Sequence, residues 1–345
     1  MHMADALISP VVGLSMWVIS AGSIAYCSKK VKEEADDRKV PLMGVLGAFI
    51  FAAQMINFSI PATGSSGHLG GGMILTILLG PFAAFLVMAS VLTVQALFFG
   101  DGGLLALGCN IFNLGIFPCF LAYPFIYRKI AGNKLSKGRI ITGSIIGATV
   151  ALELGAFGVV LETVSSKISE LPFDTFVLLM QPIHLAIGVV EGVVTAAVVM
   201  FVWNARPELL NAVSRYEPVG RINMRKVFVG LLIAAAITGG ALSWFASSRP
   251  DGLEWAMFKT SGKEVLENNG GVHASLAAIQ EKTAFLPGYG FKKEEREIGI
   301  ETAARPSWPA AHQGTSTAGL VGGGLTLLLI VLAGLGLRRR AKTVK

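Results

Sequence analysis

The first two residues, Met1 and His2, offer nitrogen donors to a metal ion. The Met1 amine and the His2 backbone nitrogen close a five-membered chelate ring, and the His2 backbone nitrogen and its own Nδ1 close a six-membered ring. This planar set requires the amide to lose its proton, which Cu(II) and Ni(II) promote most readily, and both accept square-planar nitrogen ligands. A bulky second residue disfavours removal of the initiator methionine, and the terminus lacks the basic segment of a cleavable signal peptide. We therefore predict that the N-terminus forms a metal site with one coordination position still to be filled.

The donor for this fourth position must come from elsewhere in the chain. The histidines are His2, His68, His184, His273 and His312. His68 lies in the Gly/Ser-rich stretch INFSIPATGSSGHLGGGM and directly precedes a Gly-interrupted apolar segment. Transporters place binding sites at short or Gly/Pro-interrupted hydrophobic segments. We expect His68 to complete the site of Met1 and His2.

Other polar residues are candidates for supporting or competing roles. Side chains that could orient His2 or His68, or simply form structural polar contacts, are Asn57, Ser66, Asn110 and Asn113. His184 and Glu191 lie two helical turns apart and share one face of a predicted helix. Ionisable residues inside a membrane are functional candidates, but a mutually satisfied structural pair is the simpler interpretation, and Glu153 is treated in the same way.

The elements that must position these residues are membrane helices. The chain has 345 residues, of which 53% are hydrophobic and only 15% charged, against roughly 25% charged in soluble domains. Apolar runs approach or exceed the roughly 20 residues that span a bilayer, at 8–27, 42–57, 104–127, 140–161, 175–203, 227–245 and 318–337. The sequence predicts an all-α, polytopic protein of the cell (inner) membrane.

The distribution of Lys and Arg predicts the topology. Twenty of the 29 basic residues fall in four clusters, at 29–39, 128–139, 204–226 and 338–345. Short cytoplasmic loops collect basic residues, so the N-terminus should lie outside and the C-terminus inside. Parity then requires the apolar stretch 69–99 to break near Gly80-Pro81 into two short helices, or to cross once with a re-entrant piece elsewhere before Tyr127; about nine membrane segments result. Because the positive charge lies between membrane segments, we expect membrane lipid and no nucleic acid among the partners.

The chain divides into two predicted modules. Residues 1–219 form a membrane core, and residues 220–345 form two further membrane helices joined by an external segment, 247–317. No catalytic constellation is apparent, and no G-x-x-x-x-G-K-[ST] phosphate-binding loop occurs. Active transport would therefore depend on separate ATP-binding subunits and a membrane coupling subunit.

Three stretches carry a resemblance to a known family. The terminus MHMADALISP, the loop NFSIPATGSSGHLGG and the segment QPIHLAIGVVEG (181–192) resemble the CbiM/NikM family, the substrate-binding membrane subunits of energy-coupling-factor transporters for nickel or cobalt. The segment SSRPDGLEWA (247–256) resembles the PDGLE motif of the companion subunit CbiN/NikN. The likeness covers nearly the whole chain and indicates a natural fusion of the two subunits.

The resemblance implies a core of seven helices with an extra N-terminal helix. It also implies a metal bound by the Met1 amine, the His2 backbone and imidazole nitrogens, and the His68 imidazole. The expected substrate is Ni²⁺, with Co²⁺ as the alternative, and no cofactor is expected beyond the transported metal. Two other classes compete: a membrane-embedded enzyme that uses His184 and Glu191, which lack a nucleophile, and a metal sensor, which would need a long cytoplasmic output domain.

Overall fold

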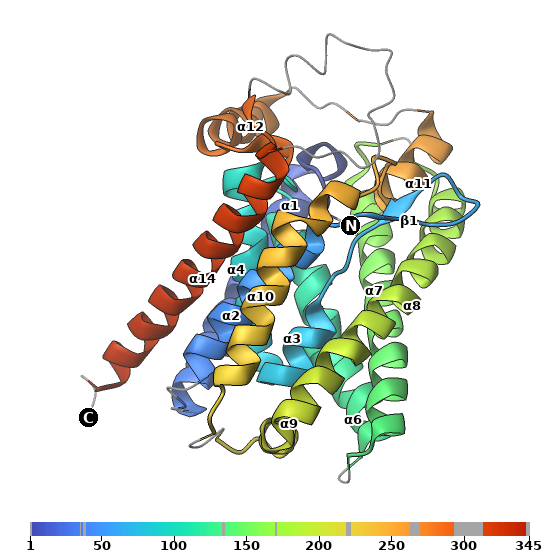
Figure 1. The fold of residues 1–345 in the computed structure, drawn as a ribbon. Helices are drawn as coiled ribbons and strands as arrows, with labels where there is room; N and C mark the ends of the chain where they lie inside the picture. The colour runs from blue at the N-terminus through green and yellow to red at the C-terminus, as the bar shows by residue number, and fades with distance from the viewer. Residues whose placement is uncertain are drawn as a thin grey trace.

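The structure is a helical bundle in which one end carries most of the loops (Figure 1). The computed structural model describes residues 2–34, 36, 39–132, 135–169, 171–218, 222–262, 266, 270–292 and 313–342. Apart from two strands of two residues each, the described elements are helices. The all-α prediction is therefore confirmed.

Within the described residues, six helical stretches are long and apolar enough to cross a membrane. They are α1 (Pro10–Glu34), α4 continued by η2 (Pro81–Phe99), the continuous stretch Leu107–Ala131, α7 (Lys137–Ser166), α8 (Phe173–Ala205) and α14 (Gln313–Lys342). The stretch Leu107–Ala131 joins α5 (Leu107–Ile111), the π-helix η3 (Phe112–Tyr127) and α6 (Arg128–Ala131). Two prolines inside η3, Pro118 and Pro124, remove backbone donors, and a wider helical turn accommodates that loss.

Shorter apolar helices complete the bundle. These are α2 (Lys39–Gln54), α3 (Gly72–Leu79) and α10 (Arg225–Gly240). The predicted break at Gly80-Pro81 is confirmed, because α3 ends at Leu79 and α4 begins at Pro81. Gly80 has φ +81°, a conformation that glycine adopts without strain, and proline is well suited to the first helical position that follows.

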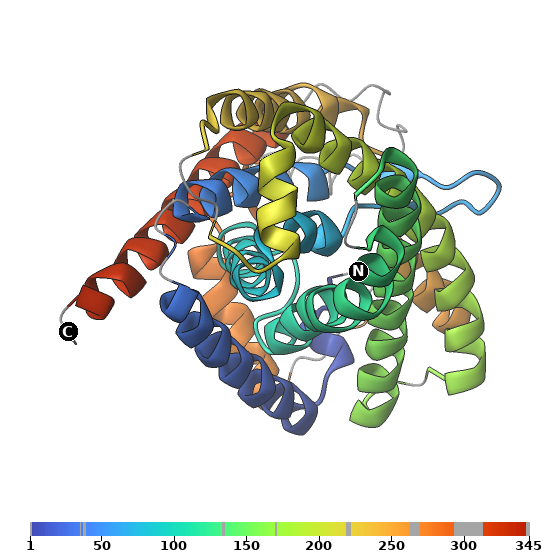
Figure 2. The ribbon, with the colours of Figure 1, turned by 90° about the horizontal axis from the view of Figure 1, so that it is seen from below.

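The helices pack as two neighbouring groups (Figure 2). Helix α7 lies along α8, and η3 packs against α7. Helices α10 and α14 pack against α2 and against each other. Helix α1 is peripheral, and several of its large apolar residues, including Val11 and Val18, are mostly exposed, as expected for a surface that faces lipid.

The two ends of the bundle differ in kind. One end, called here the histidine end, carries η1 (Asp5–Leu7), the hairpin of β1 (Phe58–Ser59) and β2 (Ser66–Gly67), η4 (Leu242–Phe245), α11 (Gly252–Ser261), α12 (Gly271–Thr283) and η5 (Pro287–Tyr289). The opposite end, called here the basic end, carries α6, α9 (Pro207–Ser214) and the start of α7.

Candidate metal centre

The N-terminus is fastened inside the histidine end by hydrogen bonds to residue 3. The Met3 amide donates to Asn110 Oδ1 (2.8 Å), and Asn110 Nδ2 donates back to the Met3 carbonyl (3.2 Å). The Gly103 amide also donates to this carbonyl (2.9 Å). Met1, the predicted source of the terminal amine, lies outside the described residues. Asn110 therefore orients the terminus through its backbone, as a residue supporting His2 should.

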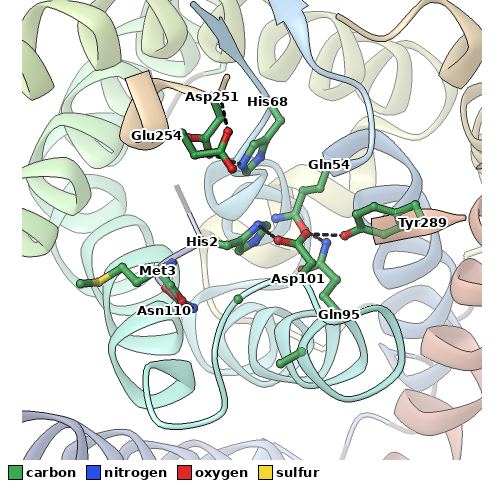
Figure 3. A network of polar contacts seen from close by, with 12 residues as sticks. His2, Met3, Gln54, His68, Gln95, Asp101, Asn110, Asp251, Glu254 and Tyr289 are labelled. Atoms are coloured by element: carbon green, nitrogen blue, oxygen red, sulfur yellow. Dashed lines mark hydrogen bonds and ion pairs between the residues drawn. The ribbon is translucent and has the colours of Figure 1, made fainter. Parts of the chain in front are cut away.

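His2 and His68 lie against each other although 65 residues separate them in the sequence (Figure 3). Their ring centroids are 4.9 Å apart, and the ring planes differ by only 12°. Their side chains are 6% and 8% exposed, respectively. Because the lone pair of each ring nitrogen lies in the plane of its own ring, the lone pairs of two stacked rings lie in separate, nearly parallel planes. One ring must therefore turn before both can bind a single metal.

The His68 ring is oriented by its own backbone. Its Nδ1 lies 3.1 Å from the Leu69 carbonyl, so the N–H at this position donates to that oxygen. The other ring nitrogen, Nε2, then carries the lone pair, an arrangement typical of metal-binding histidines. Burial lowers the pKa of His68 to about 3, which keeps the ring neutral and able to bind a metal near neutral pH.

The backbone that follows His68 is held by Glu191 from α8. The amides of Gly70 and Gly71 donate to its two carboxylate oxygens, each at 2.9 Å. Gln54 Nε2 donates to the Gly70 carbonyl (2.8 Å). Gly71 has φ +76°, so this turn suits glycine. Glu191 thus fixes the segment that carries His68 and lies beside the site without touching it.

Asp101 binds the His2 ring from the other side. His2 Nδ1 lies 3.1 Å from Asp101 Oδ1, and the Tyr289 hydroxyl donates to Asp101 Oδ2. Burial alone would raise the pKa of Asp101, but the His2 ring and the Tyr289 hydroxyl stabilise the carboxylate and lower it below its usual value. The remaining His2 nitrogen, Nε2, is buried and has no hydrogen-bond partner among the described residues.

A second carboxylate, Asp251, faces the His68 ring. Its Oδ2 lies 3.9 Å from His68 Nε2. The same side chain starts helix α11, because its Oδ1 accepts the Glu254 amide (2.8 Å) while Glu254 Oε2 accepts the Asp251 amide (3.0 Å). This reciprocal cap fixes the carboxylate in place. The PDGLE sequence thus folds as a helix start whose capping residue points at His68.

Backbone contacts fasten the PDGLE segment to the loop that carries His68. The Ser66 amide donates to the Pro250 carbonyl (2.8 Å), and its hydroxyl donates to the Arg249 carbonyl (2.7 Å). The Ser247 amide donates to the Asn57 carbonyl (2.7 Å). Ser66 and Asn57 therefore join two distant segments, and these contacts are made with the PDGLE segment rather than with either imidazole.

His184 and Asn113 occupy the shell around the site. His184 Nδ1 bonds the Met180 carbonyl one turn earlier (2.8 Å), so among the described residues it is not paired with Glu191. A Cβ on Gly252 would lie 3.1 Å from His184 Cε1, so α11 sits directly on this ring. Asn113 donates to Glu162 (2.7 Å) and approaches the Met3 sulfur (4.0 Å). Both residues support packing beside the site.

The sequence predicts that His2 and His68 meet, and the structure brings their rings together, but the sequence analysis did not select Asp101, Asp251 or Tyr289. Asp101 had a weak signal, because it is an acidic residue in a very short connection predicted to be external. Asp251 is the first acidic residue of PDGLE, but the orientation of its carboxylate toward His68 depends on the helix cap. Tyr289 had no signal in the sequence. The described residues contain no cluster of three or more His, Cys, Asp or Glu side chains able to hold a metal, which leaves backbone and terminal nitrogens as the additional donors to consider.

The arrangement favours a metal dication. Two imidazoles lie between two carboxylates, with Asp101 beside His2 and Asp251 beside His68. Negative groups around a buried site attract cations and hold them more strongly than they would in water. The described site carries no nucleophile beside a general base and thus no equipment for covalent catalysis.

In comparisons with known proteins, the chain is similar to metal transport proteins. Residues 2–209 match the family model described as the cobalt uptake substrate-specific transmembrane region, CbiM, and residues 225–339 match the PDGLE domain. The chain is 27% identical over 349 residues to the fused nickel transport protein NikMN of Rhodobacter capsulatus, covering 98% of this chain and 96% of that protein. It is 28% identical over 224 residues to the cobalt transport protein CbiM of Geobacter sulfurreducens, covering 61% of each. A crystal structure of a truncated transition metal transporter matches with a TM-score of 0.53 and 31% identity, covering 59% of this chain and 99% of that one.

Proposed function

Because the chain belongs to the CbiM family of substrate-specific transmembrane regions for metal uptake and carries a PDGLE domain, we propose that it captures Ni²⁺ for an energy-coupling-factor importer. One observation carries this proposal: His2 and His68 stack in a buried position between two carboxylates. The chain is a multi-pass membrane transport component and not an enzyme. Its ATP-binding subunits and membrane coupling subunit are separate chains in this proposal.

The proposed ligands are all nitrogens. They are the Met1 amine, the His2 backbone nitrogen, His2 Nδ1 and His68 Nε2. Ni(II) accepts a square-planar nitrogen set and assists loss of the amide proton. The His68 ring already presents Nε2, because its Nδ1 is used by the Leu69 carbonyl. The terminal amine belongs to a residue outside the described part of the chain, so its place in the ligand set rests on chelate chemistry.

When the metal binds, it replaces Asp101 as the partner of His2 Nδ1 in this proposal. In the structure this nitrogen faces Asp101 at 3.1 Å. Closing the six-membered chelate requires the ring to turn its Nδ1 toward its own backbone nitrogen, which also ends the parallel stacking on His68. Asp101 keeps a hydrogen bond from Tyr289 after His2 leaves, so its carboxylate is not left alone in a buried position.

The two modules have separate tasks in this proposal. Residues 1–219 supply the ligands, and residues 220–345 form the companion module, of which Asp251 and Tyr289 contact the groups around the site. The contacts of Asp251 with His68 and of Tyr289 with Asp101 support this division. The companion module thus contributes the carboxylate of Asp251 and, through Tyr289, a hydrogen bond that holds the carboxylate of Asp101 in place.

We also propose nine membrane segments with the N-terminus outside. The six long helices, together with α2, α10 and the segment formed by loop 68–71 and α3, give this number. The histidine end would face the outside, where metal arrives, and the basic end would face the cytoplasm.

Uptake of ⁶³Ni²⁺ by cells that produce the chain with and without its partner subunits tests the proposed function. Accumulation that requires the partners, and that excess Co²⁺ suppresses only weakly, supports nickel capture. Stronger suppression by Co²⁺ than by unlabelled Ni²⁺ would transfer the same role to cobalt, the alternative substrate. No accumulation of either metal in the presence of all subunits would contradict the proposal.

A further inference from the structure

A cavity of about 540 Å³ is lined by residues of the basic end. In Figure 1 this end lies opposite the β1–β2 hairpin and α11. The cavity is enclosed by the end of η3 with α6, by α3 and by α9. Its lining includes Ile77, Tyr123, Tyr127, Arg128, Lys129 and Arg215. The cavity is far larger than the small spaces beside His68 and Glu191, and the proposed metal capture does not use it.

The charged side chains that line this cavity are all basic. They are Arg128, Lys129 and Arg215, and no carboxylate is among the described lining residues. Across the described part of the chain, none of these three cations forms an ion pair within 4.0 Å. Concentrated positive charge beside a low-dielectric wall attracts anions and repels metal dications.

Arg128 is held in a fixed orientation. Its Nη1 donates to the Tyr216 hydroxyl (3.0 Å), and its Nη2 donates to the Ser214 carbonyl (3.2 Å). The guanidinium also lies 4.8 Å from the centre of the Tyr216 ring. A guanidinium restrained in this way loses little further freedom when it binds, and its planar set of donors matches the oxygens of a phosphate.

The surroundings place the cavity at a membrane margin. Lys129 lies 5.8 Å above the ring of Phe125, which is 59% exposed. Helix α9 buries Leu209, Leu210 and Val213 and exposes Pro207, Glu208 and Asn211. Exposed aromatic residues beside cations are characteristic of the headgroup region, and basic pockets between membrane helices bind phosphorylated lipid headgroups.

We propose that this cavity binds a phosphate group, carried by an anionic phospholipid or free in solution. Arg128 would provide the oriented donors, and Lys129 and Arg215 would add charge at the mouth. Because α9 lies in the connection between α8 and α10, the bound phosphate would fasten the junction of the core and the companion module.

Native mass spectrometry of the delipidated full chain in a non-ionic detergent tests this proposal. The probes are dioleoyl phosphatidylglycerol and dioleoyl phosphatidylcholine, which share acyl chains but differ in net charge, with inorganic phosphate as a competitor. We expect phosphatidylglycerol to bind at least about tenfold more tightly than phosphatidylcholine. Removal of each cation should weaken the binding of phosphatidylglycerol about fivefold, since one basic residue near an anionic headgroup contributes about 1 kcal/mol.

Three variants isolate the cavity. Arg128→Gln with Arg215→Gln should weaken binding of phosphatidylglycerol about 25-fold. Lys129→Gln with Arg215→Gln should act similarly while leaving the contacts of Arg128 intact, so an effect of misfolding is separated from an effect of charge. The control, Lys29→Gln with Lys226→Gln, removes two cations that do not line the cavity, one from the last turns of α1 and one from the first turn of α10, and should change binding less than twofold.

The outcomes are distinct. Competition by millimolar inorganic phosphate would assign the site to a free anion, and lack of competition would assign it to a lipid headgroup; both support phosphate binding. Equal binding of the two lipids, or equal weakening by the control and the cavity variants, would overturn the proposal.

Discussion

The histidine end and the basic end of this bundle have opposite electrostatic character. At the histidine end, Asp101 and Asp251 flank the imidazoles of His2 and His68, and both carboxylates have partners in another part of the chain. At the basic end, Arg128 and Arg215 line a cavity whose described lining includes no carboxylate. A dication is therefore favoured at one end and repelled at the other.

The two ends also differ in how they are built. The histidine end is assembled from segments far apart in the sequence, as the contacts of Ser66 with Pro250 illustrate. At the basic end, Arg128 bonds Ser214 and Tyr216, 86 and 88 residues away in the sequence, beside an open space of about 540 Å³. A tightly packed, capped site suits selective capture of one small ion, whereas an open cationic cavity suits a larger anion.

Removing a metal ligand should produce the largest difference between the two ends. We expect His68→Ala to weaken Ni²⁺ binding by at least about 100-fold, because it removes a direct donor, and even supporting residues of metal sites account for roughly 10- to 100-fold. Arg128→Gln with Arg215→Gln should change it by less than about twofold. Isothermal titration calorimetry of the purified chains measures both. Comparable losses of Ni²⁺ affinity in the two variants would contradict the distinction between the two ends of the bundle.

Removing the clamp behind His68 should have the next largest effect. Glu191→Gln keeps the shape of the side chain but leaves one acceptor for the two amides of Gly70 and Gly71. Hydrogen bonds to charged groups contribute about 1.5–3 kcal/mol, so we expect Ni²⁺ affinity to fall about tenfold and the thermal unfolding midpoint to fall as well. Unchanged affinity, despite a lower midpoint, would make Glu191 purely structural.

Neutralising a flanking carboxylate should have a moderate effect. Asp251→Asn retains an oxygen that can cap α11 but removes the charge near His68. We expect Ni²⁺ affinity to fall about five- to tenfold, since a partly buried charge a few ångströms away is worth about 1 kcal/mol or more. Asp174→Asn, which neutralises an exposed acidic residue at the start of α8, is the matched control. Equal effects would mean that only net charge matters.

Crowding the contact between the modules should have the smallest effect. A Cβ at Gly252 would lie 3.1 Å from Ile183, His184 and Ile187. We expect Gly252→Ala to shift α11 slightly and to slow ⁶³Ni²⁺ uptake about two- to threefold, because overpacking costs about 1 kcal/mol or more. Gly240→Ala, where the added methyl meets nothing within 4 Å, should leave uptake unchanged.

Local chemistry made part of this structure predictable from the sequence. The break at Gly80-Pro81 follows from a positive φ that favours glycine and from the fixed φ of proline. His2 and His68 were chosen because a planar chelate at the terminus lacks one nitrogen donor. These predictions needed only residue types, helix geometry and charge distribution.

The remaining parts depend on tertiary contacts that no local pattern encodes. Asp251 reaches His68 only because β2 binds the PDGLE backbone and a helix cap aims the carboxylate. Tyr289 reaches Asp101 across 188 residues. The interpretation of His184 and Glu191 as a mutually satisfied pair required their side chains to meet, but each bonds a different backbone segment.

X-ray absorption spectroscopy of the Ni²⁺-loaded full chain tests the proposed ligand set most directly. With a free terminal amine, we predict four nitrogen donors in a square plane, two of them imidazoles, and loss of one imidazole contribution in His68→Ala. Inserting alanine between Met1 and His2 should also remove the His68 contribution, because the lengthened terminus can then supply all four nitrogens. A six-coordinate, oxygen-rich Ni²⁺, or a spectrum unaffected by both changes, would contradict a site formed by the terminus and His68.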